Sequence, residues 1–268
     1  MDRNREILIM GIVNLTDDSY FADSRCADVQ AAMDRIARLV SEGADIIDIG
    51  ACSTRPGSLP VGAEEEWRRL EPVLTAFKEN FQNVTLSIDT YWATVVEKTF
   101  GLVGPFIVND ISAGEADPEM LPTVGRLGLK YVAMHMRGTP ANMQELTDYN
   151  NVVEDVLDYF RNFSKKAKIH SINDWILDPG FGFAKTLEQN YALMRGLGKL
   201  KAEMSSCQML VGVSRKSMIY KLLGITPEES LPATQALHMA ALERGADILR
   251  VHDVAEAVRT VALFKKLS

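Results

Sequence analysis

The chain has 268 residues, 47% of them hydrophobic and 24% charged, which is enough to bury one core of α/β-barrel size or two smaller ones. Its formal net charge of −7 and its lack of a Lys/Arg run argue against a nucleic-acid surface, and no apolar stretch is long enough to cross a membrane. The polar residues 1–6 do not resemble a signal peptide. Cys26, Cys52 and Cys207 indicate neither a disulfide framework nor a zinc knuckle, so we expect a cytoplasmic protein.

Short apolar runs, rich in β-branched residues, recur along the whole chain. Each run predicts a strand that is buried on both faces, as the strands of a parallel sheet are. The runs cover residues 7–13, 44–49, 84–88, 106–108, 131–134, 175–177, 209–213 and 248–251.

The segments between the runs have the periodicity of amphipathic helices. The first expected helix stops at Gly43, and the second contains Pro72, which we expect to kink or divide it. A short helix ends at Gly224, a longer one follows Pro227, and the last covers about residues 254–267. The apolar faces of the first two helices are marked by Val29, Met33, Ile36 and Val40, and by Trp67, Leu70, Leu74 and Phe77.

Strand and helix therefore alternate in units of roughly thirty residues, which predicts a (β/α)₈ barrel, the TIM barrel. We expect residues 1–268 to form it as a single domain, because no linker or low-complexity segment divides the chain. A doubly wound sheet is the alternative. It is disfavoured by the even alternation and by the lack of a Gly-x-Gly-x-x-Gly turn after the first strand.

Polar residues follow nearly every expected strand. In a barrel the carboxyl ends of the strands meet at one rim, where enzymes of this fold build their active sites. Polar loops alone explain one or two such residues, but not charged or amide residues in almost every unit. The residues are Asn14, Ser53, Thr54, Arg55, Asp89, Asn109, Asp110, His135, Asp178, Ser214, Arg215, Lys216, Arg250, His252 and Asp253.

Three of these rim residues are cations on separate units. Arg55, Lys216 and Arg250, with His252 beside the last, indicate a phosphorylated ligand, because guanidinium groups bind phosphate oxygens in pairs. The alternative for the arginines is an ordinary surface ion pair. Ser214 precedes a short helix, where it either contributes to an anion site or is a plain N-cap.

Two carboxylates and an amide, Asp89, Asp178 and Asn109, also end strands. In an apolar cavity they would match a flat heterocycle with alternating donors and acceptors, although both aspartates are also typical of caps and turns. Asn14 is a candidate ligand for Mg²⁺ held with a diphosphate. His135 and His252 are too isolated to indicate a transition-metal site. The residues alone thus predict a barrel that binds a diphosphate next to a polar heterocycle.

Eight motifs, in order from the first strand to the last, resemble those of the dihydropteroate synthase family of pterin-binding barrels. They are Ile9–Thr16 with Asp18, Ser19 and Tyr20; Gly43–Gly50 leading to Ser53–Gly57; Ser87–Tyr91; Val108–Ser112; Met134–Pro140; Asp178–Phe183; Gly212–Ser217; and Arg250–Val254.

The resemblance implies a role for each rim residue. The pterin would lie against Asp89, Asn109, Asp178 and Lys216, beside Met134. Its diphosphate would be bound by Asn14 with Mg²⁺, and by Arg55, Arg250 and His252. The second substrate, p-aminobenzoate, would lie near Phe183 and Lys216, with its carboxylate by Gly212 and Ser214. The loops after the first two strands would close over it, bringing Tyr20, Thr54 and Pro56.

The resemblance also implies the reaction. p-Aminobenzoate would displace diphosphate from 6-hydroxymethyl-7,8-dihydropterin diphosphate, giving 7,8-dihydropteroate in folate biosynthesis. Lys216, Arg250, His252 and Arg55 would be the catalytic residues that stabilise the departing charge. Members of the family are sulfonamide targets and form homodimers, which we therefore expect here.

The chain departs from the family pattern in three places. Asp17 stands where proline is usual, Cys52 stands where glutamate is usual, and the segment before the first strand is short. These departures concern loop shape, p-aminobenzoate affinity and sulfonamide response rather than the pterin residues. Two rival functions remain: a corrinoid-dependent methyltransferase, which needs no diphosphate cluster, and a non-catalytic relative that only binds pterin.

Overall fold

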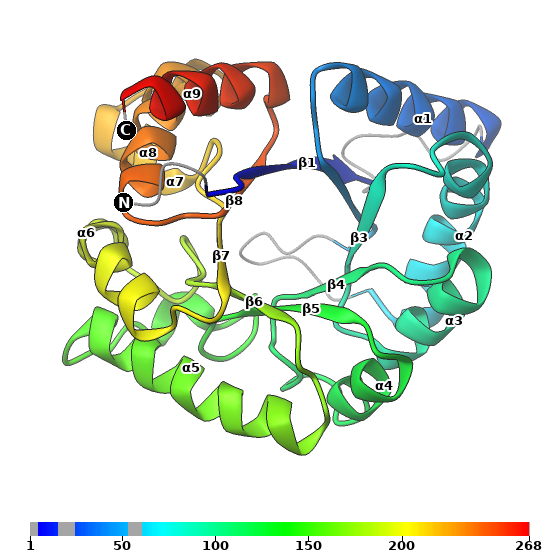
Figure 1. The fold of residues 1–268 in the computed structure, drawn as a ribbon, viewed down its shortest axis with the longest axis horizontal. Helices are drawn as coiled ribbons and strands as arrows, with labels where there is room; N and C mark the ends of the chain where they lie inside the picture. Colours follow the sequence, from blue (N-terminus) through cyan, green and yellow to red (C-terminus); the bar gives the residue numbers. More distant parts are fainter. Residues whose placement is uncertain (1–4, 16–24, 53–60, 268) are drawn as a thin grey trace.

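The structure is a computed structural model that describes residues 5–15, 25–52 and 61–267. Its parallel strands close a barrel in chain order, and helices surround the barrel (Figure 1). The strands are β1 (Leu8–Asn14), β2 (Ile46–Gly50), β3 (Thr85–Asp89), β4 (Ile107–Asp110), β5 (Lys130–Met134), β6 (Trp175–Asp178), β7 (Gln208–Val211) and β8 (Ile248–Val251).

Among the described residues, an α-helix follows every strand, and a further one precedes β8. The α-helices are α1 (Arg25–Ser41), α2 (Ala63–Asn80), α3 (Ala93–Val103), α4 (Met120–Leu127), α5 (Val152–Ile169), α6 (Leu187–Glu203), α7 (Ser217–Leu223), α8 (Leu231–Glu243) and α9 (Val254–Leu267). Short 3-10 helices, η1 (Met143–Glu145) and η2 (Glu228–Ser230), lie in two of the loops. None of the helices in the described ranges is both long and apolar enough to cross a membrane.

The closed β1–β8 pairing confirms the predicted (β/α)₈ barrel and shows that a doubly wound sheet is wrong. Several strands extend one or two residues beyond the apolar runs, because the backbone ladder continues through polar residues such as Asp89 and Asp178. β7 instead ends at Val211, two residues earlier than predicted. Pro72 does not divide α2, which continues from Ala63 to Asn80.

The barrel interior has an apolar layer under a polar one. Buried side chains from seven of the strands form the lower layer, as expected of a packed barrel core: Met10, Ile46, Ile107, Val132, Ile176, Leu210 and Ile248. Above it, strand register pairs Asn14 with Gly50, Gly50 with Asp89, and Asp89 with Asn109. Four neighbouring strands therefore present these residues at one level of the carboxyl-end rim.

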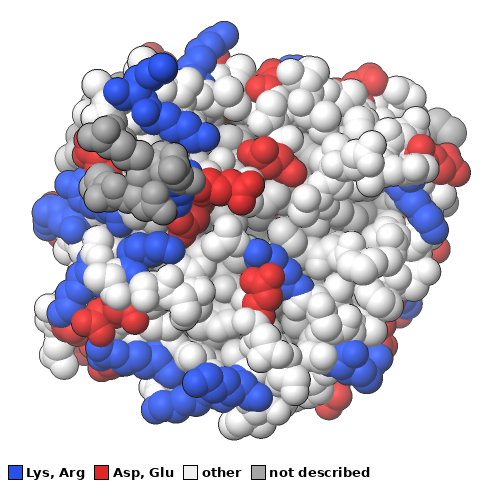
Figure 2. Space-filling view, in the orientation of Figure 1, with Lys and Arg blue, Asp and Glu red and all other residues white. Residues whose placement is uncertain are grey.

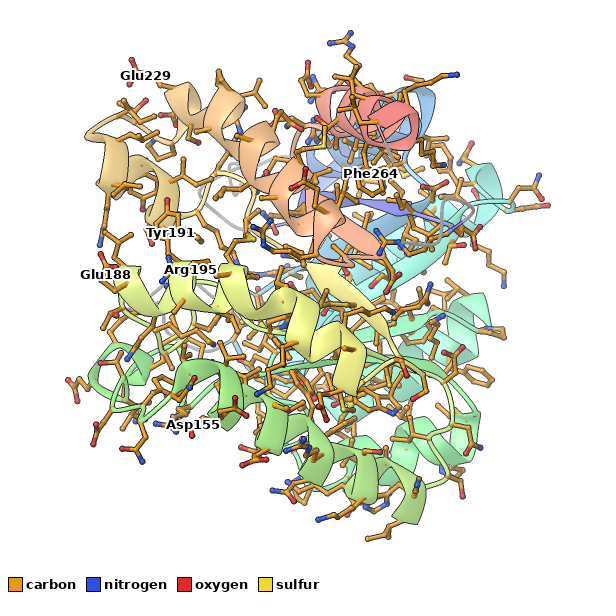
Figure 3. All side chains as sticks on the ribbon, turned by 60° about the vertical axis from the view of Figure 1, so that its left-hand side comes forward. Asp155, Glu188, Tyr191, Arg195, Glu229 and Phe264 are labelled. Atoms are coloured by element: carbon orange, nitrogen blue, oxygen red, sulfur yellow. The ribbon has the colours of Figure 1, made fainter. Side chains whose placement is uncertain are left out.

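A larger apolar cluster lies between the strands and the surrounding helices, and it fixes the helices that carry the rim loops. The hydroxyl of Tyr191 on α6 donates to the carbonyl of Met218 on α7 at 2.9 Å, which ties the short α7 to its neighbour (Figure 3). Basic and acidic side chains are interspersed over the face seen in Figure 2.

Two adjacent glutamates in the first turn of α2 have opposite environments. Glu65 is bound by the guanidinium groups of Arg68 and Arg69, which lower its pKa to about 2. The side chain of Glu66 is fully buried, and neither of its oxygens has a hydrogen-bond partner at normal distance within the described part of the chain. Burial raises the pKa of Glu66 to about 7, and the neighbouring Thr90 lowers it by a smaller amount.

The buried Glu66 should make stability fall as pH rises. Below its unfolded-state pKa of 4.5 the carboxyl is protonated in both states, so the folded state bears no penalty. Above pH 7 the folded state must hold a buried charge. We expect Glu66→Gln to match wild type at pH 4 and to exceed its free energy of unfolding by up to about 3 kcal/mol at pH 8, measured by urea denaturation.

Glu65→Gln is the matched control, with the opposite sign. Glu65 has a lowered pKa, so its contribution is present above pH 4.5 and is lost as pH falls toward 2. A Glu66→Gln profile parallel to that of wild type between pH 4 and 8 would contradict the assignment.

Two helical glycines should respond to alanine in opposite directions. A Cβ at Gly125 in α4 would lie 1.7 Å from the carbonyl oxygen of His170, whereas a Cβ at Gly101 in α3 would meet nothing within 4 Å. Gly125→Ala should destabilise the fold by roughly 1–3 kcal/mol or more through overpacking. Gly101→Ala should stabilise it by about 0.5–1 kcal/mol through helix propensity. Equal effects in thermal unfolding would be inconsistent with this packing.

Candidate active site

A buried ion-pair network crosses the top of the barrel. The guanidinium of Arg250 on β8 donates from Nε to Asp48 on β2 at 2.7 Å, and its Nη2 lies 2.6 Å from Asp48 and 2.8 Å from Asp89 on β3. Burial lowers the pKa of Arg250, but the two carboxylates outweigh it and raise the pKa above its ordinary value. Arg250 therefore stays charged in the interior.

Asp48 is the centre of this network. It is fully buried and also accepts hydrogen bonds from Ser87 Oγ at 2.6 Å and from Asn109 Nδ2 at 3.1 Å. A carboxylate can only accept, so the Asn109 amide must turn its nitrogen toward Asp48. The amide oxygen of Asn109 is thus left as an acceptor for a ligand.

Asp89 and Asp48 both bind Arg250, so the negative charge of Asp48 opposes ionisation of the Asp89 carboxyl. Burial raises the pKa of Asp89 to about 7, Arg250 lowers it in part, and the negative charge of Asp48 adds to the rise. Two carboxylates and one guanidinium leave the network with an excess of negative charge. A ligand that brings hydrogen-bond donors would relieve that excess.

Asp178 and Lys216 are a second carboxylate and ammonium at the rim, and each acts on the other electrostatically. Asp178 ends β6 and accepts the backbone N–H of Gly180 at 2.8 Å, and burial raises its pKa against the opposing charge of Lys216. Lys216 Nζ donates to the carbonyl of Phe181 and lies 4.9 Å from the centre of the Phe183 ring. Burial lowers the pKa of Lys216 to about 8, which Asp178 partly offsets.

Gly212 lies close to both Arg250 and Lys216. A Cβ there would be 3.8 Å from Arg250 Cβ and 3.9 Å from Lys216 Nζ. Next to this group, Met134 belongs to a small buried apolar cluster against which Tyr91 and Phe183 pack. The site therefore combines apolar surfaces with buried acceptors, which suits a flat heterocycle.

Lys185 holds the loop after β6 in place. Its buried ammonium lies 3.0 Å from His135 Nδ1 and donates to the carbonyls of Gly180 at 2.9 Å and Phe183 at 3.0 Å. Burial lowers the pKa of Lys185 to about 7 and that of His135 well below its usual range. Gly180 has φ +71°, and a Cβ would lie 2.0 Å from the His135 carbonyl oxygen, so this turn requires glycine.

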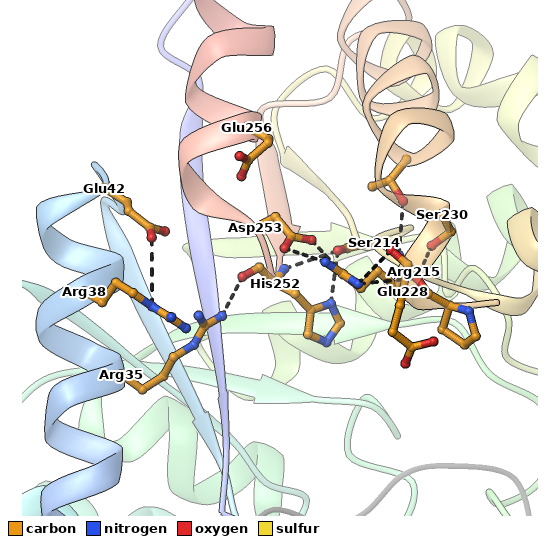
Figure 4. A network of polar contacts seen from close by, with 12 residues as sticks. Arg35, Arg38, Glu42, Ser214, Arg215, Glu228, Ser230, His252, Asp253 and Glu256 are labelled. Carbon is orange, nitrogen blue, oxygen red and sulfur yellow. Dashed lines mark hydrogen bonds and ion pairs between the residues drawn. The ribbon is translucent and has the colours of Figure 1, made fainter.

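A polar chain surrounds His252 after β8 (Figure 4). Ser214 Oγ lies 3.0 Å from His252 Nδ1 and accepts the backbone N–H of His252 at 3.2 Å. Arg215 binds Asp253 through two contacts of 2.8 Å, which joins the loops after β7 and β8. Burial lowers the pKa of His252 to about 4, so its imidazole is neutral at physiological pH.

The structure brings most of the predicted site residues together, while their individual roles stay predictions. Asp89, Asn109, Asp178, Lys216 and Arg250 meet inside the rim, with Met134, Phe183 and Gly212 beside them. Asn14 and His252 line a pocket at its edge, where Ser214 contacts His252. Thr54 and Arg55, like Asp17, Tyr20 and Pro56, lie outside the described residues.

Three cap interpretations are wrong. Ser214 is not the N-cap of α7, because that position is occupied by Lys216 and the Ser214 hydroxyl contacts His252 instead. Asp89 and Asp178 do not cap the next helices, whose N-caps are Trp92 and Thr186. Asp178 does, however, have the turn contact expected of its Asp-Pro-Gly sequence.

Sequence reasoning missed Asp48, Lys185 and Arg35. An aspartate inside the apolar run Ile46–Gly50 was a usable signal, because an unpaired charge in a buried strand is costly. Lys185 gave no comparable signal, since it lies in a loop and is buried only by tertiary contacts. Arg35 lies on α1, and only the fold brings it to the carbonyl of His252.

The donor set fits Mg²⁺ better than a transition metal. No group of three or more His, Cys, Asp and Glu side chains that could hold a metal ion occurs in residues 5–15, 25–52 and 61–267. Asn14 is exposed at the end of β1 and lines the same pocket as Asp34. Mg²⁺ prefers oxygen ligands and is commonly shared with substrate phosphates, so the Asn14 side-chain oxygen would suit it if a diphosphate were bound.

Comparison with known proteins matches this geometry. Residues 10–252 match the family model described as "Pterin binding enzyme". The chain is 37% identical to the mitochondrial folate synthesis bifunctional protein of Pisum sativum, over 98% of its own length but 54% of that protein. It thus spans about half the length of that relative.

Shorter relatives are covered almost completely. The chain is 38% identical to dihydropteroate synthase of Escherichia coli K12, over 94% of its own length and 89% of that protein. A crystal structure of Yersinia pestis dihydropteroate synthase in a sulfonamide drug complex superposes with a TM-score of 0.90 at 36% identity, covering 100% of this chain and 96% of that one. The chain belongs to the pterin-binding enzyme family, within its dihydropteroate synthase group.

Proposed function

We propose that the protein is a dihydropteroate synthase, a transferase that joins p-aminobenzoate to 6-hydroxymethyl-7,8-dihydropterin diphosphate and releases diphosphate. The observation that carries the proposal is the arrangement of buried acceptors on Asp89, Asn109 and Asp178 beside the cations Arg250 and Lys216. Membership of the family and the names of the relatives support it.

The pterin ring fits the donors and acceptors of the rim. Asp89 and Asp178 can accept hydrogen bonds from ring nitrogens and the exocyclic amine, and the Asn109 oxygen can accept another. Met134 supplies an apolar surface beside them. Burial removes water from these carboxyl groups, and in the free protein their hydrogen-bonding capacity is not fully used. Hydrogen bonds from a ligand would therefore stabilise them strongly.

Cations adjacent to the ring would stabilise the leaving group. The bond between the pterin methylene and the diphosphate oxygen breaks, and negative charge grows on the diphosphate as Lys216 and Arg250 hold a positive field nearby. Mg²⁺ at Asn14 would supply further charge neutralisation when bound. The neutral amine of p-aminobenzoate forms the new C–N bond and then loses a proton.

The second substrate fits the Phe183 side of the site. The Phe183 ring and Lys216 together offer an aromatic face and a cation for p-aminobenzoate. Lys185 donates to the backbone carbonyl of Phe183, and this contact would help to position the ring for the attack. Mg²⁺ dependence, sulfonamide inhibition, a homodimer and a cytoplasmic location remain part of the proposal.

An assay for diphosphate release tests the function directly. With both substrates and Mg²⁺, the purified protein should form dihydropteroate and diphosphate in equal amounts. A folded sample that binds the pterin but forms no product would favour the non-catalytic relative. Methyl transfer to a corrinoid without diphosphate release would favour the methyltransferase.

Asp178→Asn should weaken pterin binding while the barrel stays folded. The amide places a donor where the pterin also has donors, so the loss should be at least about 2 kcal/mol, or roughly 30-fold in Kd by calorimetry. Asp174→Asn is the control, because Asp174 precedes the same strand at the opposite end of the barrel and is 70% exposed. If both variants bind the pterin like wild type, Asp178 is only a turn residue.

A further inference from the structure

Three consecutive polar residues in the turn after β7 contact different parts of the molecule. Ser214 Oγ contacts the imidazole of His252, and Lys216 Nζ donates to the carbonyl of Phe181. Arg215, which lies between them in sequence, instead binds the carboxylate that follows His252. One turn thus presents two residues of the candidate site, one on either side of Arg215.

The backbone of this turn is strained at Arg215. The N–H of Lys216 donates to the carbonyl of Val213 at 3.2 Å, so residues 213–216 form a turn with Arg215 in its third position. Arg215 has φ +53°, a left-handed conformation that glycine or asparagine usually adopts at this position. An arginine in this conformation costs free energy, so other contacts must hold it there.

The contacts that hold Arg215 come from three other segments. Its backbone N–H donates to Oγ1 of the buried Thr234 on α8 at 3.3 Å. Its guanidinium binds both oxygens of Asp253, and Figure 4 shows this pair between the loops after β7 and β8. Its Nη1 also donates to the carbonyls of Pro227 and Glu228 at 3.4 Å. These segments therefore fix a residue whose own conformation is unfavourable.

Asp253 is the charged partner among these contacts. Its side chain is 19% exposed and that of Arg215 is 26% exposed, so water screens the pair only in part. Burial raises the pKa of Asp253, but the guanidinium outweighs it and holds the pKa below its usual value. An arginine that binds both carboxylate oxygens is also fixed in direction. The pair therefore orients Arg215 as well as binding it.

We propose that Arg215, bound by Asp253, is a positioning residue that directs Lys216 into the rim and so sets the affinity for the pterin. The inference rests on the proposed function, in which Lys216 lies against the pterin. Lys216 directly follows Arg215, so a change of φ at Arg215 would redirect the Lys216 side chain. Its ammonium would then move relative to Asp178, with which it interacts electrostatically. Arg215 and Asp253 act through Lys216 rather than on the substrate.

Calorimetry with a pterin that lacks the diphosphate tests the pair without turnover. Asp253→Asn keeps the size of the side chain but removes its charge, so it should weaken pterin binding about 10-fold. Arg215→Lys keeps the charge without the two parallel hydrogen bonds, so it should lose less affinity than Arg215→Ala. Wild-type affinity in both Asp253→Asn and Arg215→Ala would overturn the proposal.

Arg215→Gly and Arg215→Ala separate the side chain from the backbone. Glycine adopts the left-handed conformation freely, whereas alanine keeps the strain. Both variants lose the guanidinium, so both should bind the pterin at least as weakly as Asp253→Asn, and alanine should be the weaker binder. If the glycine variant binds the pterin like wild type, the turn needs only its backbone conformation and the positioning role of the side chain is wrong.

The pH profile of pterin binding gives a readout that a loss of stability would not change. Burial lowers the pKa of Lys216 to about 8; Asp178 and Asp89 oppose this shift, and Arg250 adds to it. Wild-type affinity should therefore fall above pH 8, as the ammonium loses its proton. A redirected Lys216 would be more hydrated, so in Asp253→Asn this fall should move to higher pH. A fall at the same pH as in wild type would contradict the redirection of Lys216.

Asp247→Asn is the matched control for Asp253→Asn. Asp247 directly precedes β8 at the opposite end of the barrel, and its carboxylate is bound by Lys201 at 2.7 Å. The control should unfold at a lower temperature than wild type but bind the pterin within twofold of it. Equal losses of pterin affinity in the two variants would count against the proposal, because any loss of stability would then suffice.

The positioning role and the proposed function can fail separately. If the wild type releases diphosphate on turnover but Asp253→Asn and Arg215→Gly bind the pterin normally, the positioning role is wrong and the synthase function stands. If the wild type forms no product but both variants lose pterin affinity, the positioning role stands without that function. A wild type that binds no pterin would overturn both.

Discussion

The guanidinium of Arg250 between Asp48 and Asp89 is the contact on which the rim depends. It joins β8 to β2 and β3 across the barrel, deep enough that water screens it little. Removing the arginine would leave two carboxylates close together and buried, which is strongly destabilising. The same contact fixes Asn109, because Asp48 accepts from both side chains. This contact of one arginine with two carboxylates therefore supports the fold and also positions Asp89 and Asn109 in the site.

Charge balance links the site to its ligand. The apolar layer below the rim excludes water, so the carboxyls above it are desolvated and their pKa values rise. The pKa values of Lys216 and Lys185 fall for the same reason. Such a site gains from a ligand that brings donors to the carboxyls and an anion to the cations. A pterin diphosphate brings both.

The strand-end aspartates were predictable from sequence, and the buried partners were not. Asp89 and Asp178 follow apolar runs, and a barrel places all strand ends at one rim, so their meeting followed from the alternation alone. Asp48 lies on β2 two residues before the strand ends, inside an apolar run, so the sequence pattern did not indicate that it belongs to the site. Ser214 has the sequence position of a helix cap, yet its hydroxyl forms a hydrogen bond with the imidazole of His252, a residue far away in the sequence. Arg55 was predicted from its place among the rim cations and Thr54 from the family motif, and both lie outside the described residues.

Proton release on pterin binding tests this account most directly. The free site holds Asp89 with a pKa of about 7, and the bound pterin needs that carboxylate ionised as an acceptor. Calorimetry in buffers of different ionisation enthalpy should show roughly one more proton released per pterin at pH 6 than at pH 8.5, and Asp89→Asn should remove that difference. Equal proton release at the two pH values, or the same difference in Asp89→Asn, would contradict the claim that the Arg250 network sets the charge of the pterin site.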